Sequence, residues 1–209
     1  MLKRWLMIAL AIVLVSGLIC FNAPSEAAAA ARRGPGTSTA SPTSPAPYPP
    51  TGPASNKADG DGPFDVRHTP SVDTPTIRRV LQSYNSPAAG AAEALYRLGI
   101  EYGIDPAFCL AFFINESLAG TEGLARVTKA VGNVRAAPGD QQYRGFRKYV
   151  TWEQGIEAWY QLIRDHYIGE RGLVTVDQIV PVYAPASDGN HTGEYITIVK
   201  RLVRGWRGT

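Results

Sequence analysis

Residues 105–120, DPAFCLAFFINESLAG, hold the feature that most constrains the fold, a segment that is apolar from Ala107 to Ile114. The Asp-Pro pair before it is typical of a helix start, because aspartate caps free N–H groups and proline fits the first helical position. Gly120 is a suitable stop. A helix that is apolar nearly all round must be covered by protein on every side. We therefore predict that this helix lies at the centre of a mainly helical domain.

A carboxylate, Glu116, follows the apolar run directly. If the helix extends from about Pro106 to about Leu118, Glu116 occupies its last turn, where the negative end of the helix dipole disfavours a second negative charge. Desolvation by apolar neighbours acts in the same direction, so both effects raise the pKa of the carboxyl. A raised pKa is what a general acid needs to be protonated near neutral pH. Pairing with an arginine is the alternative that the spacing leaves open.

The first 29 residues have the three parts of a secretory signal peptide. Lys-Arg at positions 3–4 precedes an apolar stretch from Trp5 to Phe21, and small residues follow, with cleavage expected near Ala29 or Ala31. An uncut membrane anchor is the alternative, since 17 residues lie at the short limit for a spanning helix. In either case we expect the rest of the chain to work outside the cytoplasm, secreted or attached to the cell envelope.

Residues 30–62 are predicted to be a disordered linker. Of the 31 positions 32–62, 24 are Pro, Gly, Ser, Thr or Ala, and the only large apolar side chain is Tyr48. Such a composition cannot bury enough apolar surface to offset the entropy cost of ordering. The remaining residues, 63–209, are numerous enough for one domain with its own core.

The charge and cysteine content of this domain exclude several classes of function. Residues 63–209 hold sixteen Lys and Arg against fifteen Asp and Glu, a net charge of +1, whereas a nucleic-acid binder should carry a strong basic excess. The domain has one cysteine, Cys109, so it forms no internal disulfide. Its three histidines lack metal-ligand spacing, and no phosphate-binding glycine loop precedes a helix. We expect a monomer without metal or cofactor.

Helix start signals stand at three further places: Ser86-Pro87, the capping box of Thr151 and Gln154, and a second box of Thr175 and Gln178. The first opens a helix with Leu95, Leu98 and Tyr102 on one face. The closing segment, GEYITIVKRLVRGW, is expected to be a surface helix with an apolar stripe of Tyr195, Ile198, Val199, Leu202 and Trp206. Residues 126–150 lose clear periodicity, and their glycines and aromatics indicate a loop or short hairpin.

Four segments resemble, in order, the bacterial peptidoglycan endo-β-N-acetylglucosaminidases, a family with a lysozyme-like fold. They are ESLAGTEGLA (116–125), VGNVR (131–135), FRKY with TWEQGIEAWYQLI (146–163), and PVYAPASDGNHTGEYITIV (181–199). The resemblance covers about 104–206. It departs from the family in two places, because the 131–135 loop lacks the fuller N-N-L-F-G-I-K form and Gly155 stands where serine is common.

The resemblance implies that Glu116 donates a proton to the leaving glycosidic oxygen. Glycosidases usually employ a second carboxylate, for which Asp140 is the candidate and Glu122 and Asp188 are alternatives. Asp140 after Pro138-Gly139 is also typical of a solvated turn residue. An N-acetyl sugar can instead supply its own amide oxygen as the nucleophile, which removes the need for a second residue.

The same segments hold candidate sugar-binding residues. Aromatic rings that could stack on sugars belong to Tyr143, Phe146, Tyr149 and Tyr183, with core packing as the alternative for each. Side chains that could hydrogen-bond the glycan belong to Asn133, Arg135, Asp188 and Asn190. We therefore predict a hydrolase that cuts a β-1,4 bond of the peptidoglycan glycan strand, after N-acetylglucosamine. A lytic transglycosylase with the same acid and a non-catalytic wall-binding module are the alternatives.

Overall fold

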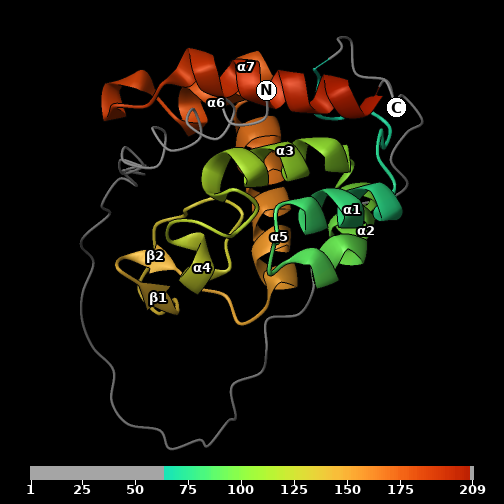
Figure 1. Ribbon diagram of the computed structural model, residues 1–209. Helices are drawn as coiled ribbons and strands as arrows, with labels where there is room; N and C mark the ends of the chain where they lie inside the picture. Colours follow the sequence, from blue (N-terminus) through green and yellow to red (C-terminus); the bar gives the residue numbers. More distant parts are fainter. Residues whose placement is uncertain (1–63, 208–209) are drawn as a thin grey trace, which may run out of the picture.

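The computed structural model describes residues 64–207 (Figure 1). The predicted signal peptide or anchor and the linker lie outside the described residues. Within the described part, 60% of the residues are helical and the only sheet has two short strands, so the predicted mainly α fold is confirmed. None of the helices between residues 64 and 207 combines the length and apolar character needed to cross a membrane.

The elements follow one another along the chain with short connections. In order they are α1 (Thr74–Ser83), the 3-10 helix η2 (Ala89–Ala91), α2 (Ala92–Tyr102), α3 (Pro106–Ser117), α4 (Ala125–Thr128), β1 (Gln142–Tyr143), β2 (Phe146–Arg147), α5 (Trp152–Gln161), the π-helix η3 (Leu162–Glu170), α6 (Val176–Tyr183), the 3-10 helix η4 (Ala186–Asp188) and α7 (Thr192–Arg207).

Helix α3 is the predicted central helix. The Asp105 side chain caps it by accepting from the Ala107 N–H, and every residue from Pro106 to Ile114 is buried. Helices α2, α5 and α7 all pack against α3, so its apolar surface is covered from several sides (Figure 1). This helix supplies the rigid base on which Glu116 stands.

Helix α5 and η3 form one continuous helical segment behind α3. The predicted capping box is confirmed, with the Thr151 hydroxyl accepting from the Gln154 N–H and the Gln154 side chain accepting from the Thr151 N–H. Ile156, Trp159 and Ile163 are buried as their spacing predicts. The wider π-helical winding of η3 was not predicted; such segments are rare and occur frequently at functional sites.

Residues 125–150 form a small lobe, hereafter the lobe, beside α3 and α5. It contains the unpredicted short helix α4 and the predicted hairpin, in which Tyr143 pairs with Phe146 across an antiparallel turn. The lobe rests directly on α5, because a Cβ at Gly155 would collide with the Lys129 carbonyl. The absence of a side chain at position 155 therefore has a steric reason in this fold.

Helix α7 lies antiparallel along α3, with Tyr195 at the end of α3 and Arg207 at its start, and α6 packs against α7 (Figure 1). The Gln178 side chain accepts from the Thr175 N–H at the start of α6, as the second capping box predicts. The Thr192 hydroxyl donates to the Ala184 carbonyl at 2.7 Å and closes the loop between the two helices. The most buried α7 residues are Tyr195, Val199 and Val203, so the buried stripe is turned slightly from the predicted one.

The helix predicted to open at Ser86-Pro87 instead begins at Ala92, after a turn and η2. The Ser86 side chain does accept from the Ala88 N–H, so it caps the turn rather than the helix. Its hydroxyl also donates to the carbonyl of Ala119, a contact distant in sequence that competes with simple helix capping. Leu95 and Leu98 are nevertheless buried on the predicted face of α2.

Candidate active site at the end of α3

The chain reverses abruptly after Glu116 through a left-handed turn. Leu118, Ala119 and Gly120 have φ values of 47°, 58° and 82°. A non-glycine residue in this region costs on the order of 1 kcal/mol or more, so two in succession persist only where neighbouring groups hold them. Gly120 cannot be replaced without strain, because a Cβ there would meet the rings of Trp152 and Phe113.

Four hydrogen bonds hold this turn in place. The Ser117 hydroxyl donates to the Phe113 carbonyl at 3.2 Å and accepts from the Gly120 N–H at 3.0 Å. The Ser86 hydroxyl donates to the Ala119 carbonyl at 2.6 Å. The Thr121 hydroxyl donates to the preceding Leu118 carbonyl at 2.8 Å. The ESLAGT segment thus builds a fixed support directly behind the Glu116 carboxyl.

Three tyrosines from three elements surround Glu116. The Tyr195 hydroxyl, on α7, donates to Glu116 Oε1 at 2.7 Å. The Tyr183 ring, on α6, lies 6.1 Å from the Tyr195 ring and 5.9 Å from that of Tyr167 on η3, measured between centroids. Phe112 packs against both Tyr183 and Tyr195 from α3. Glu116 is half-buried, and of the three tyrosines Tyr195 contacts its carboxyl directly.

Burial raises the pKa of the Glu116 carboxyl to about 7, and the hydrogen bond from Tyr195 opposes part of that rise. Burial also raises the pKa of Tyr183 and of Tyr195, and the nearby negative charge of Glu116 raises both further. The pKa of Tyr167 is raised by burial and by Glu116, while the positive charge of Arg171 lowers it. Near neutral pH the site therefore holds protonated tyrosines around a carboxyl that can carry or release a proton.

The lobe reaches this cluster through the loop of residues 131–133. Gly132 lies against the Tyr183 hydroxyl, with the Trp159 ring beside it, and leaves no room for a side chain. Asn133 follows and is half-buried. The Tyr183 hydroxyl and the Trp159 indole N–H are buried and have no hydrogen-bond partner of good geometry among the described residues. The Trp159 side chain interacts with the Tyr183 hydroxyl and lowers its pKa, so the two buried polar groups lie against each other.

The other predicted lobe residues form local contacts. Asp140 accepts from the Ala137 N–H and from Arg147 Nε, both at 2.7 Å, and these contacts lower the pKa of its carboxyl. Arg135 places its guanidinium 4.5 Å from the centre of the Phe146 ring. Tyr149 is half-buried, with its hydroxyl enclosed. No recorded contact joins Asp140 to Glu116, and its surroundings are those of a turn residue.

Asp188 and Asn190 lie in the loop between α6 and α7. Asn190 Nδ2 donates to the Pro185 carbonyl at 3.0 Å, and Asp188 accepts from the Ser187 hydroxyl at 3.2 Å. Both are half-buried, and the loop they belong to joins the helices that carry Tyr183 and Tyr195. Glu122, the other alternative acid, is exposed six residues beyond Glu116. Among the predicted binding residues, the structure places Tyr183 near Glu116, and Asn133 follows Gly132, which lies against the Tyr183 hydroxyl.

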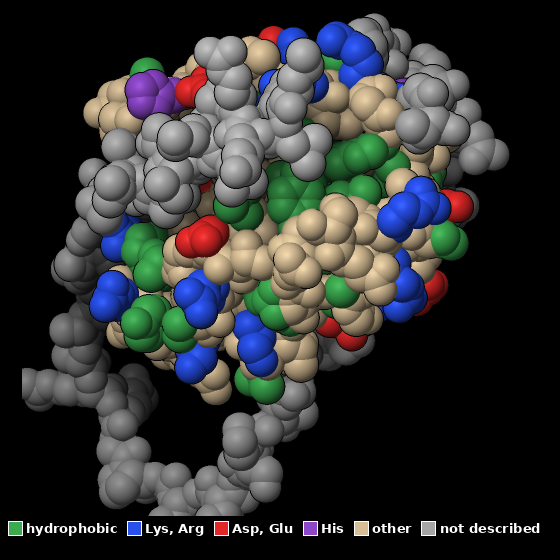
Figure 2. Space-filling view, viewed as in Figure 1, with side chains coloured by type: hydrophobic (Ala, Val, Ile, Leu, Met, Phe, Trp, Pro, Cys, Tyr) green, Lys and Arg blue, Asp and Glu red, His purple; other side chains and the backbone are tan. Residues whose placement is uncertain are grey.

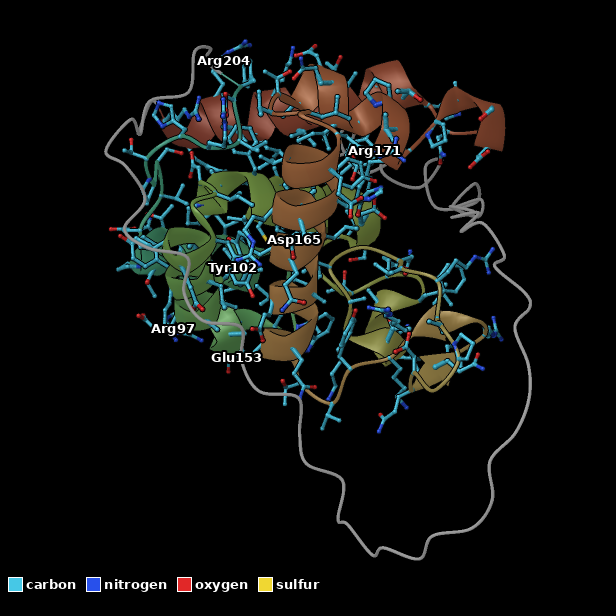
Figure 3. The ribbon with its side chains drawn as sticks, turned by 180° about the vertical axis from the view of Figure 1, so that it is seen from behind. Arg97, Tyr102, Glu153, Asp165, Arg171 and Arg204 are labelled. Atoms are coloured by element: carbon cyan, nitrogen blue, oxygen red, sulfur yellow. The ribbon has the colours of Figure 1, made fainter. Side chains whose placement is uncertain are left out.

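Sequence reasoning missed two members of the site. The sequence pattern assigns Tyr195 to an apolar stripe. Helical spacing shows that the ring faces the core, but it does not show whether the hydroxyl forms a hydrogen bond. Tyr167 stands in η3, where π-helical winding changes which residues share a face. Arg171, at the end of η3, donates from Nε to His166 Nε2 at 3.0 Å and lies near α6 and α7 (Figure 3).

A hollow of about 370 Å³ lies on a different part of the molecule, between α2 and the start of α5. An exposed ion pair of Arg97 and Glu153, 2.6 Å long, stands at its edge (Figure 3). None of the predicted site residues lines it. Exposed pairs of this kind contribute little energy, so we place no chemistry there.

Comparison of the chain with protein-family models gives no match, and comparison with curated proteins gives none. Among residues 64–207, no group of three or more His, Cys, Asp or Glu is placed to hold a metal ion. The functional interpretation therefore depends on the sequence motifs and on the geometry around Glu116.

Proposed function

We propose that this domain is a peptidoglycan hydrolase that cleaves a β-1,4 glycosidic bond of the glycan strand, after N-acetylglucosamine, with Glu116 as the general acid. The observation that carries the proposal is the Glu116 carboxyl itself. It stands on a rigid buried helix, accepts a hydrogen bond from Tyr195 and has a pKa of about 7. A carboxyl with these properties is protonated in a large fraction of molecules near neutral pH, which protonation of a leaving oxygen requires.

The chemistry that follows is proton donation to the glycosidic oxygen as its bond to the anomeric carbon lengthens. Asp140, the predicted second carboxylate, makes its hydrogen bonds within its own turn of the lobe. This favours the route in which the N-acetyl oxygen of the sugar acts as the internal nucleophile and water then opens the intermediate. Asp140 stays a predicted second group, although its ion pair with Arg147 favours a structural role.

We assign substrate contacts to the residues around the acid and along the lobe. Tyr183 borders the Glu116 cluster from α6, and Asn133 follows Gly132, which lies against the Tyr183 hydroxyl. Arg135 and Tyr149 would extend the binding surface over the lobe, and Asp188 and Asn190 over the α6–α7 loop. The proposed location is outside the cytoplasm, where this substrate is found, and the proposed state is monomeric.

The test is mass spectrometry of the fragments released from purified peptidoglycan by the wild type, by Glu116→Gln and by Glu122→Gln. Glu122 is the matched control, an exposed carboxylate in the same segment. Reducing N-acetylglucosamine ends that disappear only with Glu116→Gln support the proposal. 1,6-Anhydro ends, lighter by one water, would assign a lytic transglycosylase. No fragments from a wild type that still sediments with the wall would assign a binding module.

Asp140→Asn separates the two mechanisms for the second step. We expect the variant to keep most of the activity, because the asparagine can still accept from Ala137 in the turn. A loss comparable to that of Glu116→Gln would show that a second carboxylate takes part.

A further inference from the structure

The lobe has a net positive charge, whereas the rest of the domain is net negative. Residues 125–150 hold six Lys and Arg and one acidic residue, Asp140, a net charge of +5. The other residues between 64 and 207 hold ten Lys and Arg against fourteen Asp and Glu, a net charge of −4. The nearly neutral domain is therefore strongly dipolar. Figure 2 shows Lys and Arg side chains gathered over the lobe, at the lower left of the view.

Several of these charges face solvent without an acidic partner. Arg126, Arg144 and Lys148 are exposed, and none of them forms an ion pair with an acidic side chain between residues 64 and 207. Arg144 lies over the Tyr143 ring at 5.3 Å, as Arg135 lies over Phe146. Only Arg147 is neutralised, by Asp140. The lobe thus offers guanidinium and ammonium groups interleaved with aromatic rings, a combination suited to binding anions together with flat or apolar groups.

The basic surface begins next to the proposed catalytic acid. Gly132, in the lobe, contacts the Tyr183 hydroxyl, and Tyr183 adjoins Glu116. A glycan strand bound at Glu116 and continuing along this side must therefore pass the lobe. The sugar rings of that strand are neutral, but the stem peptides attached to it end in carboxylates.

We propose that the basic face of the lobe binds the carboxylates of these stem peptides, so that the domain prefers peptide-bearing glycan over bare glycan. The inference rests on the proposed function, since it names a second recognition element of the same substrate. Short anions that project from a neutral strand fit this charge pattern. A long polyanion such as a nucleic acid or a phosphodiester polymer would extend past the lobe. There it would meet the rest of the domain, whose net charge of −4 repels it.

The test measures binding of the full-length protein, in a Glu116→Gln background that prevents turnover, to two soluble glycan preparations. One keeps its stem peptides. The other has been stripped of them by an amidase, and the lactyl carboxylates that this hydrolysis frees have been converted to neutral amides. The lobe variant combines Arg126→Gln, Arg144→Gln and Lys148→Gln. A matched control combines Arg78→Gln, Arg79→Gln and Arg201→Gln, which removes the same charge from exposed positions outside the lobe.

We expect the lobe variant to bind peptide-bearing glycan about tenfold more weakly and bare glycan unchanged, with the control within about twofold of its parent on both. The preference for peptide-bearing glycan should also fall as salt is raised from about 50 mM to 500 mM. Equal affinity of the parent for the two glycans, or an equal loss in the lobe variant and the control, would overturn the inference. Tighter binding to a teichoic-type phosphodiester polymer would overturn it as well.

Failure of this inference is distinguishable from failure of the proposed function. A wild type that releases glycan fragments while the parent background shows no preference for stem peptides overturns only the role of the lobe. A wild type that releases no fragments, and a parent that binds neither glycan, would overturn both.

Discussion

Replacing Glu116 with glutamine should stabilise the protein, and the gain should depend on pH in a defined window. The ordinary pKa of this carboxyl is 4.5, and burial raises it to about 7 in the folded protein. Below pH 4.5 both states are protonated and the carboxyl has no effect on folding. Between pH 4.5 and 7 the unfolded chain ionises first, so the folded state loses stability relative to it. Above pH 7 the loss is complete.

The size of the effect follows from the same two pKa values. Their difference corresponds to roughly 3 kcal/mol, which we reduce to about 2 kcal/mol because part of the side chain is open to solvent. Glutamine keeps the size of the side chain and an oxygen that can accept from Tyr195, but it cannot ionise. Glu116→Gln should therefore match the wild type at pH 4 and exceed it by about 2 kcal/mol at pH 8. For a domain of this size that is roughly 6–8 °C in Tm.

Thermal unfolding followed by circular dichroism at pH 4, 6 and 8 measures the effect, with Glu122→Gln as the exposed control. The control should show no gain that grows with pH. If Glu116→Gln were equally stabilising at pH 4 and pH 8, the gain would not come from ionisation. If it were less stable than the wild type at pH 8, the argument that the folded protein disfavours the charged carboxylate would be refuted.

Three other substitutions probe the supports of the site. Tyr195→Phe removes the hydrogen-bond donor that favours the ionised Glu116, so the pKa of Glu116 should rise by roughly 1. A ¹³C titration of the carboxyl measures this as an alkaline shift of the midpoint. An unchanged midpoint would show that the hydrogen bond does not lower the pKa of Glu116. Ser86→Ala removes a buried donor to the turn after α3 and should cost about 1–3 kcal/mol in urea unfolding, with reduced activity. Gly155→Ser places a side chain against the Lys129 carbonyl and should cost roughly 3 kcal/mol; wild-type stability would show that the lobe moves freely relative to α5.

The sequence identified the elements whose signals are local. Asp105-Pro106 and the Thr151–Gln154 capping box each begin a helix where predicted, because a cap acts through hydrogen bonds within a few residues. The burial of α3 was predictable from its composition, since an apolar helix has no stable exposed orientation. The hairpin followed from turn residues between aromatics.

Features that depend on distant contacts could not be predicted. The turn of Leu118 and Ala119 has no local signal for left-handed backbone, and it is held partly by Ser86, more than thirty residues earlier. Ser86, which was predicted to cap α2, instead donates to the Ala119 carbonyl in this turn, and α2 begins only at Ala92. The partnership of Tyr195 with Glu116 spans 79 residues, so a pattern that describes one helix at a time assigns the tyrosine only to packing. Gly155 departs from the expected serine for a reason visible only when the lobe is in place.

The arrangement around Glu116 balances two opposed effects. Burial alone would raise the pKa of the carboxyl further above neutral, and a strong cation beside it would lower that pKa and favour the ionised form. Tyr195 has an effect between these two extremes. Its hydroxyl favours the carboxylate through one hydrogen bond of 2.7 Å and adds no charge. The pKa of Tyr195 is itself raised by burial and by Glu116, so the tyrosine keeps its proton and acts only as a donor. A buried carboxyl paired with a tyrosine that cannot ionise is thus held near pH 7, where both donation and recovery of a proton are accessible.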